Sequence, residues 1–186
     1  MIIFFDNQVT QNMPKDRIRG PATILADFDQ RDLALGTSGI DTTPIFPEAE
    51  NRAIRFEARN SYDYVSVHIP DFISLEIETI LIEVYITQDY LVVLSNHQTL
   101  RKLEAILTSD FGNDQSPAQM LSLLFNFILP QNFALLEKIE DEIESLEEHA
   151  TLRKPEDHTA AIISLRKQLL RAKRYFEALY NVLEEL

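Results

Sequence analysis

Apolar and polar residues alternate along much of the first part of the chain, up to about residue 110, as they do in strands with one buried face. Residues 59–61 form a short, turn-rich link between two such segments, which predicts a hairpin. The second half of residues 76–87 is apolar on both faces, so we expect it in the centre of a sheet. The six expected strands are residues 2–5, 22–25, 53–58, 62–69, 76–87 and 90–95.

Turn and cap signals separate these strands from other structure. Ser95 or Asn96 is placed to cap a helix from His97 to Thr108, which has leucine and isoleucine residues on one face. The segment Gly36–Pro47 is rich in Gly, Ser, Thr and Pro, which indicates a loop.

Helical periodicity dominates the rest of the chain. Ser116 followed by Pro117 and Gln119 is a helix start signal, and it predicts a helix over residues 117–150. Pro130 lies inside that helix and is expected to kink it, because proline removes one backbone hydrogen bond and clashes with the preceding turn.

A second start signal follows after a short connection. Pro155 is followed by two acidic residues, which complement a helix dipole and predict a helix over residues 156–186. A short connection between two helices predicts an antiparallel hairpin.

Each of these two helices carries a narrow apolar seam with steps of three and four residues, which is the geometry of coiled-coil packing. The seams are expected to pack against each other within one chain. Acidic residues on the first helix and basic residues on the second favour the same pairing weakly. The first seam is Leu136, Ile139, Ile143, Leu146 and Ala150, and the second is Ile162, Leu165, Leu169, Ala172, Phe176, Leu179, Leu183 and Leu186.

Together these elements predict an α+β fold. We expect a mixed, largely antiparallel β-sheet with flanking helices in residues 1–115, followed by a long antiparallel helical hairpin in residues 116–186. The hairpin is expected to pack with the first part.

Charge and composition exclude several classes of function. The chain of 186 residues has a net charge of −13, which repels nucleic acid, so no nucleic-acid partner is expected. It has no cysteine, which excludes disulfides, thiolate metal sites and cysteine nucleophiles. The chain contains no run of about 18 apolar residues, so no membrane span is predicted within it. No catalytic motif or phosphate-binding loop is present, so we do not expect an enzyme.

Two groups of acidic residues contain the carboxylate oxygens that hard cations prefer. The run Glu137–Glu148 could hold hydrated divalent ions, or it could be an ordinary solvated helix face. Asp27, Asp29 and Asp32 lack the glycine and distal glutamate of a calcium loop, and are expected in a turn that leads into a helix. The sequence therefore leaves the metal ligands unknown.

The four histidines lack the spacing that places two ligands on one helix face. We expect structural or surface roles for them. They are His68, His97, His149 and His158.

Several segments also resemble a known protein family in their residue sequences and in their order along the chain. They are Ser116-Pro117 with Leu121-Leu123-Leu124, then Leu135–Ile143, Leu146–Glu148 and Ile163–Leu169, and the strand pair Ile82–Ile86 and Tyr90–Val93. Over residues 52–186 this series resembles the cytoplasmic domain of the CorA family of magnesium transporters. The family's His-Pro…Glu-Asp segment has no clear match, although Asp41, Glu48 and Glu50 lie in about the right region, so its regulatory metal site is not transferred to this chain.

The resemblance implies a regulatory domain at the cytoplasmic face of the cell membrane. It implies a homopentameric channel that conducts Mg²⁺ and closes when Mg²⁺ binds between subunits, so the implied cofactor is Mg²⁺ and the partners are the chain's own subunits. Contact with the membrane would come only from a C-terminal part, and we expect the reading frame to continue past Leu186 into a stalk and a pore.

Two questions stay open at this point. The sequence does not separate Mg²⁺ from Co²⁺, Ni²⁺ or Zn²⁺ as the transported ion. An alternative function is a soluble adaptor that binds a protein partner through its coiled-coil-like helical hairpin.

Overall fold

The structure, a computed structural model, describes residues 1–5, 8–10, 20–41, 54–69, 80–109, 116–152 and 159–186. Its strands are β1 (Ile2–Phe5), β2 (Gln8–Thr10), β3 (Ala22–Asp27), β4 (Arg55–Ala58), β5 (Asp63–Ile69), β6 (Ile80–Ile86) and β7 (Tyr90–Ser95). Its helices are the short 3-10 helix η1 (Phe28–Gln30), then α1 (Arg31–Ser38), α2 (His97–Ser109), α3 (Pro117–Leu152) and α4 (Thr159–Glu185).

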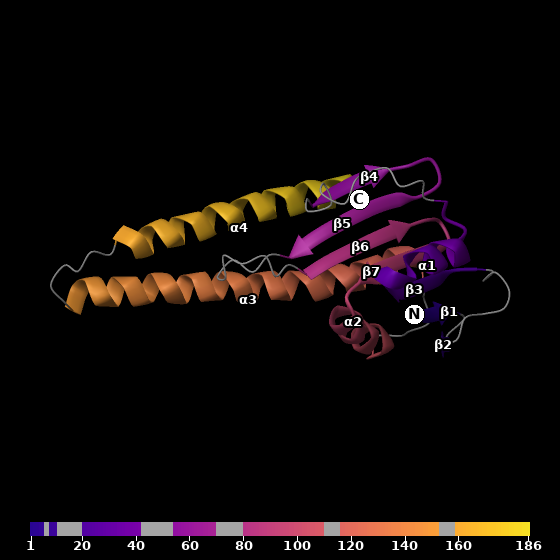
Figure 1. Ribbon diagram of the computed structural model, residues 1–186, viewed down its shortest axis with the longest axis horizontal. Helices are drawn as coiled ribbons and strands as arrows, with labels where there is room; N and C mark the ends of the chain where they lie inside the picture. The colour runs from indigo at the N-terminus through magenta and orange to yellow at the C-terminus, as the bar shows by residue number, and fades with distance from the viewer. Residues whose placement is uncertain (6–7, 11–19, 42–53, 70–79, 110–115, 153–158) are drawn as a thin grey trace.

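The strands form one mixed sheet in the order β2-β1-β3-β7-β6-β5-β4 (Figure 1). β3 and β7 run parallel, with Leu25 opposite Val93, and the other neighbouring strands of the sheet pair antiparallel. The predicted α+β fold with a mixed, largely antiparallel sheet and flanking helices is confirmed. The β4–β5 hairpin and the interior position of β6 are confirmed with it.

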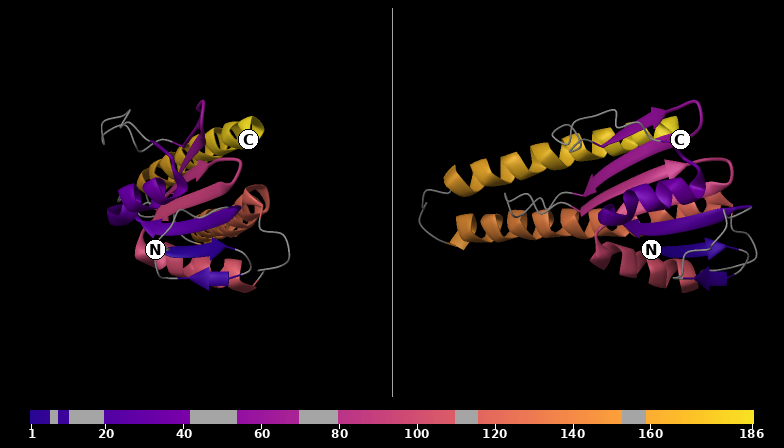
Figure 2. Two further views of the ribbon diagram at one scale, coloured as in Figure 1. Left: turned by 90° about the vertical axis from the view of Figure 1, so that its right-hand side faces the viewer. Right: turned by 45° about the vertical axis from the view of Figure 1, so that its right-hand side comes forward.

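Helices cover both faces of the sheet, unequally (Figure 2). One face packs against α2, α3 and α4, where Leu103, Ile128 and Leu179 meet Val65 and Val84 in the larger hydrophobic core. The other face carries a smaller core, in which Ala34 and Leu35 of α1 cover Ile24, Val92 and Leu94. Strand residues alternate between the two cores because successive side chains of a strand point to opposite faces.

Local capping explains where two of the helices begin. The backbone N–H of Thr99 donates to Oδ1 of Asn96 at 2.9 Å, so Asn96 caps α2. The backbone N–H of Gln119 donates to Oγ of Ser116 at 3.3 Å, as the start signal at the head of α3 predicts.

Helix α1 corrects the loop predicted over Gly36–Pro47. Residues 36–38 belong to α1, which ends where Gly39 adopts a φ of 72°, a left-handed conformation that glycine accepts without strain. Burial of Ala34 and Leu35 stabilises this short helix despite Gly36 in its interior. The expected turn into a helix after Asp27 is confirmed, and residues 42–47 lie outside the described part.

The two long helices contact each other, and α4 also contacts β4. Figure 1 shows that both helices extend well beyond the end of the sheet. Helix α3 contains Pro130, and its predicted kink stays a prediction. The predicted connection and the first residues of the second helix lie outside the described residues, so the long antiparallel hairpin also stays a prediction.

The seam predicted on α4 is partly wrong. Ile162, Leu169, Leu183 and Leu186 are exposed, by 41 to 58 % of their surface. Phe176 and three further residues of the predicted seam do pack against the core, but most of the packed residues of the helix form another stripe with the same steps of three and four residues. It consists of Leu165, Gln168, Ala172, Tyr175, Leu179 and Val182.

The misplaced seam has a simple origin. Two 3-4 stripes overlap on α4 and share Leu165, Ala172 and Leu179. Hydrophobicity alone favours the stripe richer in leucine, whereas Gln168 and Tyr175 are buried in the folded chain. The seam on the first helix fares better, because Ile139 is buried and Leu136 and Ile143 pack against the larger core.

The larger core supplies a stability prediction. Ile128 is fully buried between α3 and the sheet, so Ile128→Ala should lower the free energy of unfolding by roughly 2 to 5 kcal/mol in a urea titration. Ile163→Ala is the matched control, since Ile163 is exposed and its truncation should change stability by less than about 0.5 kcal/mol. Equal losses in both variants would contradict the packing described here.

Candidate functional site

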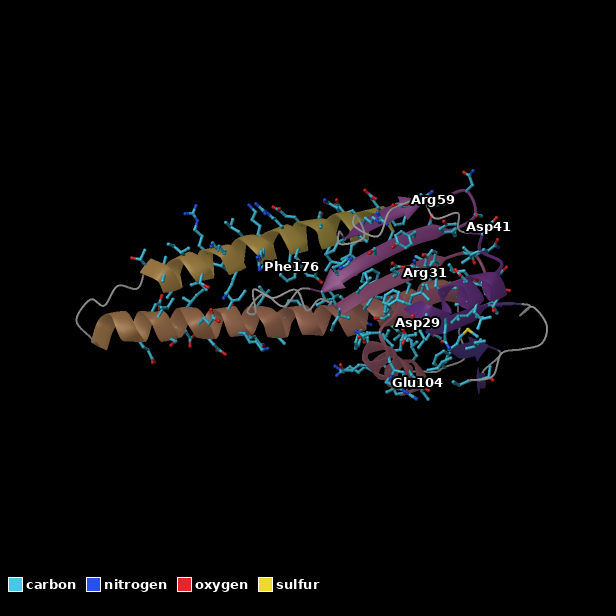
Figure 3. All side chains as sticks on the ribbon, in the orientation of Figure 1. Asp29, Arg31, Asp41, Arg59, Glu104 and Phe176 are labelled. Carbon is cyan, nitrogen blue, oxygen red and sulfur yellow. The ribbon has the colours of Figure 1, made fainter. Side chains whose placement is uncertain are left out.

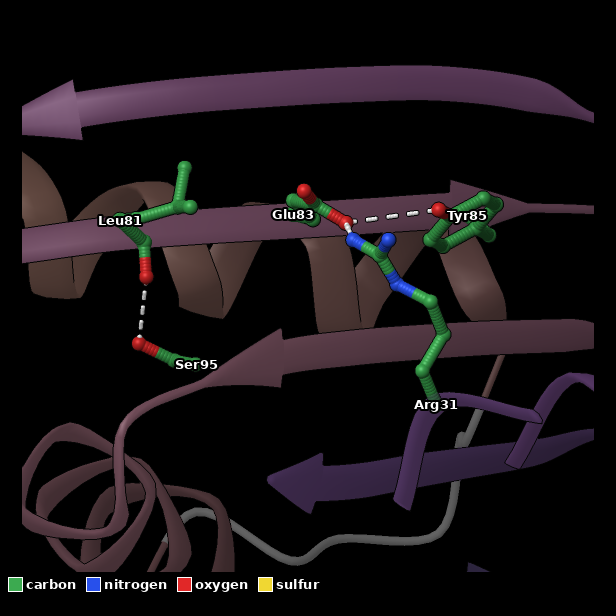
Figure 4. Close-up of polar contacts among 5 residues, drawn as sticks. All are labelled: Arg31, Leu81, Glu83, Tyr85 and Ser95. Atoms are coloured by element: carbon green, nitrogen blue, oxygen red, sulfur yellow. Dashed lines mark hydrogen bonds and ion pairs between the residues drawn. The ribbon is translucent and has the colours of Figure 1, made fainter. Parts of the chain in front are cut away.

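A buried ion pair joins α1 to the middle of the sheet. Arg31 on α1 donates to the carboxylate of Glu83 on β6, whose side chain is only 1 % exposed (Figure 4). The hydroxyl of Tyr85 donates to the same carboxylate oxygen at 3.4 Å. The pair therefore links α1 to β6, a strand that lies far from α1 in the sequence.

The electrostatics of this group follow from its burial. Burial is the largest single effect on Arg31 and would lower its pKa, but the charge and hydrogen bond of Glu83, together with Tyr85 and Tyr64, outweigh it and the pKa is raised. Burial, followed by the negative charge of Glu83, raises the pKa of Tyr85 well above its usual value. Arg31 therefore stays charged and Tyr85 stays a neutral hydrogen-bond donor, which suits a structural link.

Polar residues continue along the same face toward the edge of the sheet. Glu57 on β4 accepts from Arg59, and lies 3.4 Å from Nε of Arg55. The guanidinium of Arg55 lies 5.2 Å from the ring centre of Tyr64, which is cation–π geometry. This face therefore combines its smaller apolar core with charge and aromatic contacts, whereas the other face packs through the larger apolar core.

Sequence reasoning missed the Arg31–Glu83 pair. The signal was a single carboxylate inside the otherwise apolar strand segment Ile82–Ile86. A charge buried in a central strand needs a partner, because an unpaired buried charge is strongly destabilising.

Two of the three aspartates noted in the sequence come together with a histidine. Asp27 ends β3 and Asp29 lies in η1, and both line a cavity of about 430 Å³ that is also lined by His97 of α2. Asp32 is exposed on α1 and does not line it. Figure 3 shows Asp29 beside the end of the sheet and Glu104 on α2.

Of the four histidines, His97 belongs to this group and is exposed at the start of α2. His68 is buried on β5 and does not line the cavity. The side chain of His149 and the whole of His158 lie outside the described part, as do Glu48 and Glu50. Asp41 is exposed.

The acidic run on α3 faces solvent. Glu137, Glu140, Asp141, Glu144, Glu147 and Glu148 are exposed, and Glu142 is half-buried. Within the described residues, no three His, Cys, Asp or Glu side chains converge as a metal site would require. The described part of α3 therefore presents a diffuse acidic surface. The neighbouring helix α4 exposes basic residues, namely Arg166, Lys167, Arg171, Lys173 and Arg174.

The ion pair predicts a specific stability loss. Glu83→Gln leaves Arg31 half-buried without its counter-charge and should cost roughly 2 to 3 kcal/mol of unfolding free energy, below the range for a fully buried pair because Arg31 is 36 % exposed. Glu104→Gln is the control, since it breaks the exposed Arg101–Glu104 pair and should cost less than about 1 kcal/mol. Urea titration of both variants measures the difference, and similar losses would contradict a structural role for Glu83.

Tyr85 predicts a pH dependence. Its folded-state pKa is raised above the unfolded value of about 10. Its contribution to stability is therefore present below about pH 10 and is lost as the pH rises toward the folded-state pKa. The free energy of unfolding should fall between about pH 9 and about pH 11, and less steeply in Tyr85→Phe. An unchanged slope in the variant would refute the link to Tyr85.

Solved structures share this fold at low sequence identity. The chain matches the ZntB cytoplasmic domain from Vibrio parahaemolyticus RIMD 2210633 with a TM-score of 0.69 and 12% identity, covering 100% of this chain and 78% of that one. It matches the soluble domain of CorA from Methanocaldococcus jannaschii with a TM-score of 0.71 and 16% identity, covering 98% and 76%. The full-length CmaX protein matches with a TM-score of 0.65 and 12% identity, covering 97% of this chain and 60% of that one.

Other comparisons bear on the family directly. No curated protein matches the chain by sequence. Among the described residues, no helix has the length and apolar character needed to cross a membrane. The family model described as CorA-like Mg2+ transporter protein matches residues 29–186, which is most of the chain. The chain therefore belongs to the CorA-like Mg²⁺ transporter family.

Proposed function

We propose that this chain is the cytoplasmic regulatory domain of a divalent-cation channel that senses intracellular Mg²⁺ and gates a pore. The observation that carries the proposal is the family match over residues 29–186. The fold shared with domains described as the ZntB cytoplasmic domain and the soluble domain of CorA supports it. Mg²⁺ is the proposed transported and regulatory ion, with Co²⁺, Ni²⁺ and Zn²⁺ as the competing ions.

The charge of the chain suggests how Mg²⁺ would act. Each subunit carries a net charge of −13, and the exposed carboxylates of α3 contribute much of it. Subunits of this charge repel one another when they assemble, and divalent cations held between them offset that repulsion. Loss of the cations would then favour separation of the domains and an open pore, with binding and gating linked reciprocally.

A site shared between subunits is consistent with the described residues. No convergent group of three ligands exists among them within one chain, whereas two acidic surfaces facing each other would bring carboxylates together. We therefore propose that the chain's own subunits, arranged as a homopentamer at the cytoplasmic face of the membrane, complete the regulatory site.

The chain alone should respond weakly to Mg²⁺. A diffuse surface that is half-saturated at millimolar Mg²⁺ gains about 0.4 kcal/mol, which raises the melting temperature by only about 1 °C. Thermal melts in Mg²⁺ and in NaCl of equal ionic strength measure this response. A large, saturable rise in a chain that stays monomeric would contradict a site shared between subunits.

Self-association should also be weak. We expect the chain alone to sediment mainly as a monomer at micromolar concentration, because the proposed stalk and pore would supply most of the contacts between subunits. Analytical ultracentrifugation tests this, and a stable pentamer under these conditions would show that this domain assembles the channel by itself.

One observation favours the alternative function, a soluble adaptor. Ile162, Leu169 and Leu183 are exposed on α4 at spacings of seven and fourteen residues, which places them along one side of a heptad pattern, as in a coiled-coil contact with another helix. Reading the codons that follow Leu186 separates the two functions. A stalk followed by two apolar spans supports the channel, and an immediate stop codon supports the adaptor.

A further inference from the structure

The parallel strands β3 and β7 end side by side, and the chain leaves them toward opposite faces of the sheet. β3 continues into η1 and α1 on the smaller core, whereas β7 continues into α2 on the larger core. Such a divergence leaves a crevice outside the carboxyl ends of the strands, which is where ligands bind in open α/β sheets.

A cavity lies beside this crevice, at the end of β3, and residues of β1, β3, η1 and α2 line it. Its volume of about 430 Å³ lies within the range of roughly 300 to 1,000 Å³ that is usual for small-molecule sites. Ile2, Leu25 and Leu100 line it, and all three are also buried residues of the protein. Met1, which is half-buried, lines the cavity with them, and the exposed edges of these side chains form its apolar part.

Acceptor groups line one side of the cavity. Asp27 stands at the position that caps η1, but its side chain makes no capping hydrogen bond, so the backbone N–H groups of η1 do not occupy its carboxylate, which lines the cavity. Asp29 is exposed, and the amide of Gln30 lies next to it along the chain. These groups suit hydroxyl or amine donors.

Donor groups come from α2. His97 and Arg101 both line the cavity, and they lie four residues apart and therefore on one face of the helix. One guanidinium nitrogen of Arg101 is 3.1 Å from Glu104, which leaves other N–H donors of its five for an anion. Arginine binds phosphate with particularly favourable geometry.

The combination restricts the ligand. A bare divalent cation does not fit, because the described residues here form no metal-ligand group and Arg101 would repel it. Inorganic phosphate would contact only His97 and Arg101 of α2, and would leave the carboxylates and the apolar part of the cavity without contacts. The ligand needs an anionic end, hydroxyl donors in its middle and an apolar, planar end.

We propose that this cavity binds a nucleoside monophosphate. The phosphate would contact Arg101 and His97, the ribose hydroxyls would donate to Asp27 and Asp29, and the base would lie against Met1 and the exposed edges of Ile2 and Leu100. This inference does not depend on the proposed channel function, since it rests on the cavity alone.

Isothermal titration of the whole chain with adenosine 5′-monophosphate tests the proposal. We expect saturable one-to-one binding, with inorganic phosphate and adenosine each binding at least about tenfold more weakly, because each satisfies only part of the cavity. Arg101→Ala should weaken binding of the nucleotide about tenfold, and Asp27→Asn severalfold. Lys102→Ala and Asp32→Asn are matched controls outside the cavity and should leave binding unchanged.

Several results would overturn the proposal. They are no binding at millimolar nucleotide, equal binding of inorganic phosphate, preference for a free amino acid, or equal loss in Lys102→Ala and Arg101→Ala. Hydrogen–deuterium exchange on the wild-type chain gives a second test that needs no variant. The nucleotide should slow exchange in residues 27–30 and 97–101 and leave α4 unchanged, and protection on α4 instead would also refute the site.

Discussion

The central strands of this sheet must be covered on both faces, and the rest of the structure follows from that constraint. β3, β7 and β6 bury side chains on both faces of the sheet, so other elements must exclude water from each face. On one face, α2 and the two long helices α3 and α4 supply a large apolar core. On the other face, the eight-residue helix α1 supplies little apolar area, and the Arg31–Glu83 pair fixes it to β6.

This division of the two faces also positions the functional surfaces. Because α1 leaves β3 toward one face and α2 leaves β7 toward the other, the strand ends lie open between them and hold the cavity with Asp27 and His97. Because α3 and α4 are longer than the strands, the C-terminal part of α3 and the N-terminal part of α4 extend past the sheet (Figures 1 and 2). The exposed acids in the second half of α3 and the exposed Ile162 and Ile163 at the start of α4 lie toward these projecting ends, which suits contacts outside one chain.

The sequence predicted the fold well where periodicity is strong and failed where tertiary contacts decide. Alternation and short apolar runs located six of the described strands but missed the three-residue strand β2, and the Ser116 and Asn96 signals located the starts of two helices. Helix α1 was assigned in part to a loop because Gly36 and Ser38 disfavour a helix locally, and only burial of Ala34 and Leu35 against the sheet reverses this. The seam on α4 was shifted because buried Gln168 and Tyr175 are not hydrophobic in a sequence pattern.

The candidate sites depend even more on the fold. Nothing in the sequence connects Asp27 with His97, which come together only because β3 and β7 are parallel neighbours. Family membership was predictable from the order of elements and from residues such as those of the Leu135–Ile143 segment, whereas a metal site shared between subunits has no signature within one chain.

The proposed function is tested most directly by measuring Mg²⁺ flux through liposomes that contain the protein translated from the whole reading frame. The concentration of Mg²⁺ on the side of this domain is varied from micromolar to several millimolar, with the ionic strength held constant. A regulatory domain that senses Mg²⁺ predicts flux that falls as this concentration rises. Absence of flux, or flux that does not change with Mg²⁺ on that side, would contradict it.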